Sequence, residues 1–245
     1  MMKYFHKNQL QARHILFLFL LNITFTISAG NDQGEDFHRI QVGVNFSPDN
    51  SYRILTGDSY DIDRRNETEK ARFGYTGGLA VNFNLNKVFG IESGIQYSDK
   101  GFSGKNYWHV DGDDDYYEWW QKEVHHFHYI EIPLKARFVT GERKVRFSGS
   151  IGVTTGFLVG VATTTKYSDD RKTRTKQNDA ENYNRLNFFF SGSMGIDYKI
   201  TQKSSIRIEP TFQYGLLSTI KSKDNDLSEH LCSVGVNISY LIGIK

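Results

Sequence analysis

Eight charged residues stand at alternate positions within segments of strand-like sequence, where they could act on a proton or an ion. They are Glu92, Glu131, Lys135, Arg137, Arg146, Asp197, Arg207 and Glu209. Such a set can form a proton or ion pathway, or it can form buried ion pairs that fill a narrow interior. Because both signs are spread over several strands and not gathered at one mouth, we favour ion pairs. Removing Glu131 should then leave an unpaired cation, such as Arg137 or Arg146.

Two long polar connections form a second candidate surface. The first carries four aromatic residues beside acids, and the second carries a basic group: Tyr116, Tyr117, Trp119 and Trp120, then Arg171, Lys172 and Arg174. Exposed aromatic residues are uncommon on a loop without a ligand, partner or membrane surface. Residues 99–124 have seven acids against three lysines, or −4, whereas residues 162–184 have five bases against four acids, or +1. We expect these loops to contact each other, or a phosphorylated glycolipid.

Metal chemistry has two candidates. His126 and His128 stand two residues apart beside His125 and could share a metal ion, but no third ligand is evident. We expect these imidazoles to lie among lipid headgroups instead. The acidic segment Asp111–Asp115 could hold calcium, yet it lacks the twelve-residue spacing of a calcium loop, so we interpret it as a solvated loop. We therefore predict no metal and no cofactor.

Enzymatic chemistry has one candidate arrangement. His128 could act with Ser98 or Ser103 in a lipid hydrolase at the outer rim of a membrane barrel. No GxSxG segment supports this arrangement, and the chain has no P-loop, Rossmann glycine pattern or CxxC motif. We predict that the protein is not an enzyme and keep the rim hydrolase as the alternative.

Eight stretches of alternating apolar and polar residues must position these groups. They run over 39–47, 71–84, 88–98, 125–139, 145–161, 185–200, 205–217 and 231–244. Because side chains alternate across a strand, each stretch has one apolar face and one small or polar face. In a soluble lipocalin-like barrel the apolar face would line a cavity. The polar face here is rich in Gly, Ser and Thr, which suits a crowded interior better than a solvated surface.

The connections between these stretches alternate in length. Long polar segments at 48–70, 99–124, 162–184 and 218–230 alternate with short turns at 85–87, 140–144 and 201–204. Short periplasmic turns and long outer loops are typical of bacterial outer-membrane barrels. We predict an all-β fold, an eight-stranded antiparallel up-and-down transmembrane β-barrel, with both termini in the periplasm. The mean hydropathy of −0.51 agrees with this, because only every second strand residue faces lipid.

The N-terminal segment has the order of a secretory signal peptide. Basic residues precede the apolar run Ile15–Ile27, and small residues follow at Ser28 and Ala29. The run is shorter than a spanning helix, which leaves an uncleaved anchor as the weaker alternative. We predict a signal peptide at 1–29 and a barrel domain at 30–245. The lone Cys232 excludes an intrachain disulfide framework.

Several motifs resemble a known family. Tyr129–Leu134 reads YIEIPL, Gly90–Gly101 reads GIESGIQYSDKG, and Gly149–Gly152 and Ser205–Phe212 fit later strands. This chain resembles, from Val42 to its C-terminus, the PorT-like outer-membrane β-barrel proteins of Gram-negative bacteria. It departs from many outer-membrane barrels at its end, Leu241–Lys245, where a terminal aromatic residue is common. Some members of the family are linked to protein secretion, so the resemblance implies a secretion role without a mechanism.

These observations predict a structural or interaction protein of the cell outer membrane. We expect the side chains to fill the lumen, because eight strands enclose little more space than side chains occupy. We expect the outer loops to present a binding surface. The expected partners are outer-membrane lipid and lipopolysaccharide and an envelope or secretion protein. Export argues against nucleic acid, and we expect a monomer.

Overall fold

A computed structural model describes residues 37–57, 62, 68–104, 106–111, 117–141, 143–168, 171–176, 182–221 and 227–244. The chain divides into two units, Met1–Phe37 and His38–Lys245, and the described residues belong almost wholly to the second. The signal peptide predicted at 1–29 lies outside the described residues. Within the described part of the chain, no helix has the length and apolarity needed to cross a membrane.

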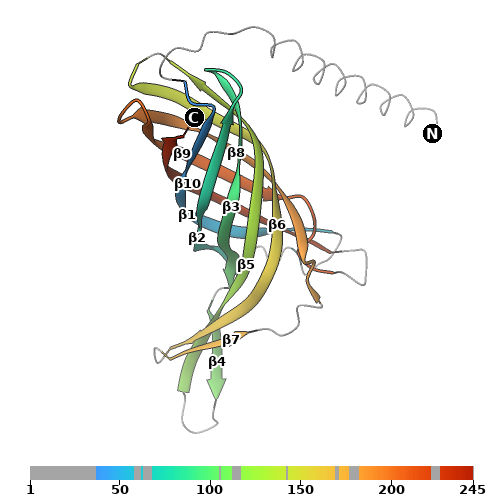
Figure 1. Ribbon diagram of the computed structural model, residues 1–245. Helices are drawn as coiled ribbons and strands as arrows, with labels where there is room; N and C mark the ends of the chain where they lie inside the picture. The colour runs from blue at the N-terminus through green and yellow to red at the C-terminus, as the bar shows by residue number, and fades with distance from the viewer. Residues whose placement is uncertain are drawn as a thin grey trace, which may run out of the picture. The chain divides into compact units, whose positions relative to one another are not determined.

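Eight long strands form a closed antiparallel ring (Figure 1). They are β1 (Ile40–Thr56), β2 (Glu69–Asn84), β3 (Phe89–Gly104), β5 (Tyr117–Thr140), β6 (Val145–Tyr167), β8 (Leu186–Lys199), β9 (Ser204–Gly215) and β10 (Ser228–Gly243). Each strand pairs with the next long strand along the chain, and β1 pairs with β10 to close the ring. The predicted eight-stranded up-and-down barrel is confirmed.

One end of the barrel carries the three short connections, at 85–88, 141–144 and 200–203. In the first turn, the side-chain carbonyl of Asn86 accepts the N–H groups of Val88 and Phe89 at 2.8 and 2.7 Å. Such Asx turns favour a sharp reversal of the chain. β1 begins and β10 ends at the same end, because Gln41 lies opposite both Asn82 and Gly243. We call this the turn end of the barrel, and the other the loop end.

The outward face of the barrel is an apolar band. Exposed large apolar side chains occur on all eight long strands, among them Val44, Phe46, Phe73, Leu79, Ile91, Ile95, Ile132, Leu134, Ile151, Val153, Phe190, Met194, Ile208, Phe212, Val236 and Ile238. The alternate residues point inward and are largely polar and buried. A soluble barrel would expose the opposite face, so this pattern fits a lipid environment outside the barrel.

The strands extend further beyond the loop end than the apolar alternation predicted. β5 begins at Tyr117 and β6 continues to Tyr167, and two short strands pair with them: β4 (Tyr107–Asp111) and β7 (Lys172–Lys176). These four segments form a sheet that projects from the barrel, ordered β4-β5-β6-β7 (Figure 1). We call it the projecting sheet. The prediction that 99–124 and 162–184 are loops was wrong for the residues in these strands.

Candidate functional site

A network of charged side chains fills the lumen near the turn end. Arg207 Nη1 lies 2.6 Å from Glu92 Oε2, and Lys135 Nζ lies 2.5 Å from Glu92 Oε1. The Asp197 carboxylate contacts the guanidinium groups of three arginines: Arg146 at 2.6 Å, Arg137 at 3.4 Å and Arg207 at 3.6 Å. The seven members are Glu92, Lys135, Arg137, Arg146, Asp197, Arg207 and Glu209. Each carboxylate touches at least one cation, as low-dielectric surroundings require.

Glu209 completes this turn-side network mainly through neutral donors. The hydroxyls of Ser148 and Ser193 donate to its two carboxylate oxygens at 2.7 and 3.2 Å, whereas Arg207 Nε lies 3.9 Å away. These contacts link the neighbouring strands β6, β8 and β9 on the lumen side. The turn-side network thus consists of ion pairs joined by hydroxyl hydrogen bonds, and each of its three acids has a cation or a hydroxyl as a partner.

Glu131 belongs to a separate pair. Its carboxylate contacts Lys100 Nζ and accepts a hydrogen bond of 2.7 Å from Ser98 Oγ. Both charged side chains are fully buried. The expectation that Glu131 balances Arg137 or Arg146 was therefore wrong. Lys100 was missed because Asp99 breaks the apolar alternation of β3, which placed Lys100 in a loop; its inward parity with Ser98 was the signal that could have found it.

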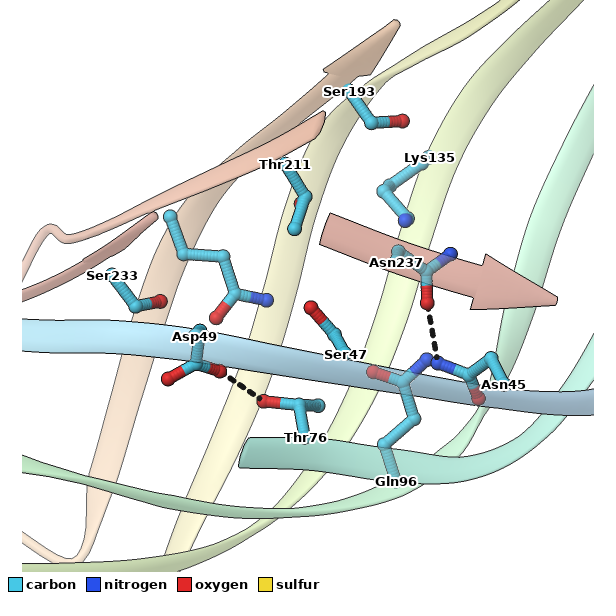
Figure 2. Close-up of a pocket in the computed structure, with 11 residues that line it drawn as sticks. Asn45, Ser47, Asp49, Thr76, Gln96, Lys135, Ser193, Thr211, Ser233 and Asn237 are labelled. Atoms are coloured by element: carbon cyan, nitrogen blue, oxygen red, sulfur yellow. Dashed lines mark hydrogen bonds between the residues drawn. The ribbon is translucent and has the colours of Figure 1, made fainter. Parts of the chain in front are cut away.

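Between these groups lies a small polar cavity of about 30 Å³. Figure 2 shows its lining, in which Thr76 donates to Asp49 at 3.2 Å and Asn45 donates to Asn237 at 3.3 Å. The other lining residues are Ser47, Gln96, Lys135, Ser193, Thr211, Gln213 and Ser233. This volume suits one or two water molecules and is too small for a solute. This part of the lumen therefore has room for water and not for a larger solute.

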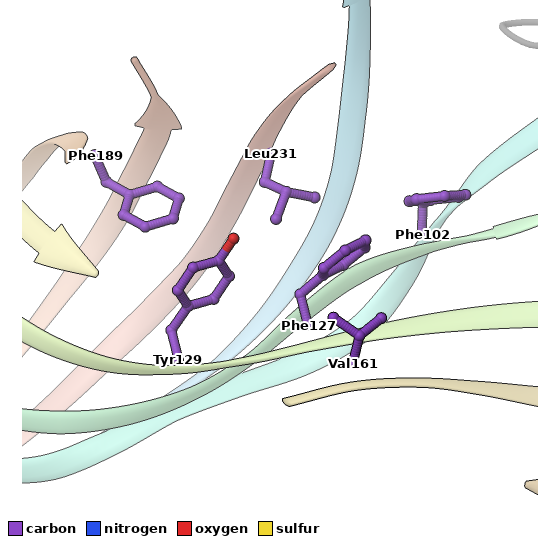
Figure 3. Packing of buried hydrophobic residues seen from close by; sticks show 6 residues of the cluster. All are labelled: Phe102, Phe127, Tyr129, Val161, Phe189 and Leu231. Atoms are coloured by element: carbon purple, nitrogen blue, oxygen red, sulfur yellow. The ribbon is translucent and has the colours of Figure 1, made fainter. Parts of the chain in front are cut away.

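An apolar cluster fills the lumen near the loop end (Figure 3). It consists of Phe102, Phe127, Tyr129, Val161, Phe189 and Leu231, and we call it the aromatic plug. The Tyr129 and Phe189 rings meet edge to face with centroids 5.5 Å apart, a favourable geometry for aromatic pairs. Gly156 makes room for them, since a Cβ there would lie 2.7 Å from the Phe189 ring. Lys100 Nζ lies 4.8 Å above the Phe189 ring, which couples the buried pair to the plug.

A second ion-pair cluster lies beyond the plug. Arg53 contacts Glu69 and Glu229, with its Nη1 2.5 Å from Glu229 Oε1, and its guanidinium lies 3.8 Å over the Phe102 ring. The His125 ring also stacks on Phe102, with ring centroids 4.5 Å apart. Burial, and then the nearby Arg53 charge, lower the pKa of His125 to about 4. The imidazole is therefore neutral at neutral pH and packs as an aromatic ring.

His126 and His128, unlike His125, lie on the outside of the barrel. His128 Nδ1 is 2.7 Å from the Tyr97 hydroxyl, and His126 Nδ1 is 3.2 Å from Asp99, which also binds Arg72. Ser98, in contrast, points inward to Glu131, and Ser103 bonds the Gly104 carbonyl. The structure therefore does not bring His128 together with either serine. Among the described residues, no group of three or more metal-binding side chains is suited to a metal ion.

The predicted loop surface is only partly described. Tyr116 lies outside the described residues, whereas Tyr117, Trp119 and Trp120 fall in β5 and Lys172 and Arg174 fall in β7. Arg171 precedes β7 and places its guanidinium 5.4 Å from the Tyr167 ring centroid. The two segments do meet as β5 and β6, but the described register sets Lys122 opposite Lys166, not an acid opposite a base. The expected contact between unlike charges is therefore wrong at this position.

Comparisons with known proteins place the chain in a family. The family model for the outer membrane protein beta-barrel domain matches residues 20–221. No curated protein matches the chain. Similar solved structures include Neisserial surface protein A (7% identity, TM-score 0.42, covering 84% of this chain and 97% of that one). Others are OprG of Pseudomonas aeruginosa (10%, 0.40, 85% and 99%) and Ail of Yersinia pestis in complex with a heparin analogue (12%, 0.37, 83% and 99%).

The family match covers most of the chain, so the protein belongs to the outer membrane protein beta-barrel domain family. Its place is the bacterial outer membrane, and the apolar band is the surface that lipid covers.

Proposed function

We propose that this barrel is a sealed, non-enzymatic interaction protein whose projecting sheet and outer loops bind partners outside the outer membrane. The observation that carries the proposal is the filling of the lumen at both ends. The turn-side network and the aromatic plug occupy the space that a channel would need, and the cavity between them is about 30 Å³. A barrel that does not conduct must act through its surfaces.

A recording of the purified protein in a planar bilayer tests the sealed lumen. We expect no stable conductance from the wild-type barrel, because both the ion pairs and the plug would have to leave the lumen for solutes to pass. Removing plug side chains in a Phe127→Ala, Phe189→Ala double variant should raise the frequency of brief openings without producing a wide pore. Stable, porin-sized conductance from the wild-type monomer would contradict the proposal.

The orientation of the projecting sheet can be tested on intact cells. A protease site inserted at 112–115, between β4 and β5, should be cleaved by external protease if the loop end faces outward. The same site at Glu142, in a short turn, should be protected until the cells are permeabilised. The opposite pattern of cleavage would reverse the topology and remove the external binding surface.

The partners that fit this surface are outer-membrane lipid, lipopolysaccharide and a protein of the envelope or the secretion apparatus. The resemblance of Tyr129–Leu134 and Gly90–Gly101 to the PorT-like proteins supports a place in secretion. Crosslinking in intact outer membranes followed by purification tests this, and recovery of a secretion component on the projecting sheet is the expected result. Crosslinks confined to lipid would restrict the role to the membrane surface, and crosslinks between copies would contradict a monomer.

A further inference from the structure

Three lysines line up across three adjacent strands of the projecting sheet. The register sets Lys122 of β5 directly opposite Lys166 of β6, and Lys166 directly opposite Lys172 of β7. Residues so placed share one face, with Cβ atoms about 5 Å apart. Like charges in that position repel each other, and among the described residues no acid forms an ion pair with any of the three. We call these residues the lysine row.

The face that carries the lysine row is the outer one. Phe127 and Tyr129 of β5 point inward to the plug, so by alternation His126 and Lys122 lie on the opposite, outer face of the strand. His126 and His128 contact Asp99 and Tyr97 there. The lysine row thus continues, along the same strands, the surface that faces lipid lower down. Along β7, Arg174 and Lys176 stand opposite Thr164 and Ala162 in the register.

The distance of the lysine row from the apolar band indicates which kind of ligand can reach it. Val159 is the last strongly exposed apolar residue of β6, at 59% exposure, and Lys166 lies seven residues beyond it. At about 3.3 Å per residue and a strand tilt of about 40°, Lys166 stands roughly 18 Å above the apolar band. The polar layer of a bilayer leaflet is only about 5–8 Å thick. A phospholipid headgroup is therefore too low, whereas a phosphate carried on the saccharide of an outer-leaflet glycolipid reaches this height.

We propose that the lysine row binds phosphate groups on the saccharide portion of an outer-leaflet glycolipid. The proposal rests on the proposed function and specifies its ligand. A phosphate placed between the ammonium groups of lysines whose Cβ atoms are about 5 Å apart would replace their mutual repulsion with attraction. The sequence grouped Arg171 with Lys172 and Arg174, but the structure separates it from the lysine row, so it serves as the control. Its guanidinium lies 5.4 Å from the Tyr167 ring centroid, and Tyr167 pairs with Gln121 and not with a lysine of the row.

Binding is tested with the full barrel in neutral phosphatidylcholine nanodiscs at low salt. The probe is the water-soluble phosphorylated core oligosaccharide released from lipopolysaccharide, and the comparison probes are the same oligosaccharide after dephosphorylation and inorganic phosphate. The Lys166→Glu, Lys172→Glu double variant should bind the phosphorylated probe about tenfold or more weakly, because two attractive charges become repulsive. Arg171→Glu should change it less than about twofold.

Several outcomes would overturn the proposal. They are equal binding of the dephosphorylated probe, equal binding of inorganic phosphate, an Arg171→Glu loss as large as that of the row variant, and no binding by the wild type. Each of these leaves the conductance and protease results intact, so failure here is distinguishable from failure of the proposed function.

The stability of Lys166→Gln provides a second, independent readout. In neutral nanodiscs this variant should raise the urea midpoint of unfolding, because it removes the central charge of a repelling row. With saturating phosphorylated oligosaccharide the wild type should have the higher urea midpoint, because it binds the ligand more tightly and is stabilised more by it. A lower midpoint for Lys166→Gln without ligand would show that acids of this chain already neutralise the row, and it would overturn the proposal.

Discussion

Near the short turns seven charged side chains fill the lumen, whereas near the loops six apolar or aromatic side chains fill it. In the turn-side network several cations share a carboxylate, so losing one acid leaves more than one charge uncompensated. In the aromatic plug each ring contributes through area and shape, so a loss leaves a void. The same narrow barrel is thus filled by two kinds of side chain that respond differently to mutation.

The largest effect is expected at Asp197. Asp197→Asn removes the carboxylate that contacts Arg137, Arg146 and Arg207, and it should lower the free energy of unfolding by about 3–5 kcal/mol. Urea titration of the barrel in detergent micelles measures this. Ser205→Ala is the matched control, since Ser205 only donates a 3.4 Å hydrogen bond to the same carboxylate. A loss for Asp197→Asn no greater than for the control would mean that the network is not interlocked.

A slightly smaller loss is expected in the plug. Phe189→Ala should cost about 3–4 kcal/mol, because it deletes a fully buried ring and leaves a cavity. The neighbouring Phe190 points outward and is 39% exposed, so Phe190→Ala should cost clearly less. Unfolding of both variants in the same bilayer compares the two faces of β8. Equal losses would contradict the inward assignment of Phe189.

Lowering the pH is expected to have an intermediate effect on the free energy of unfolding, through His125 on the loop side of the plug. The pKa of His125 falls from 6.5 to about 4 on folding, so between these values the unfolded chain binds more protons. The stability contributed by neutral His125 is complete above pH 6.5 and declines as the pH falls toward 4. We expect a loss of about 2 kcal/mol from pH 8 to pH 5. His125→Asn should reduce this slope, and an unchanged slope would assign it to other groups.

The smallest change in the free energy of unfolding is expected when Glu131 and Lys100 are both replaced by apolar residues. Glu131→Leu alone leaves the Lys100 ammonium buried without its partner and should cost about 3–5 kcal/mol. Adding Lys100→Met should bring stability back to within about 1 kcal/mol of the wild type, because buried pairs often gain little over apolar packing. If the double variant stays as unstable as the single one, then the pair has a role beyond charge balance, such as orienting Ser98.

Alternation was enough to predict the barrel but not its contacts. The alternation in the stretches at 71–84 and 88–98 indicated one apolar and one polar face. Phe189 stands at an inward position of β8 among polar residues, and its place in the aromatic plug explains this exception. The extended ends of β5 and β6 were missed because apolar and polar residues do not alternate regularly there. Register is not encoded by alternation, so the partner of Glu131 and the opposition of Lys122 and Lys166 required the paired strands.

The projecting sheet also differs from the barrel in having borders. Closure of the ring leaves no strand edge in the membrane, whereas β7 ends the projecting sheet and pairs with β6 alone among the described strands. An unpaired strand edge is a template for aggregation, and basic side chains on it discourage another chain from adding to the sheet. The sequence Lys-Thr-Arg-Thr-Lys of β7 supplies that protection. Neutralising the basic residues of β7 is therefore expected to let crowded copies of the barrel join through this edge.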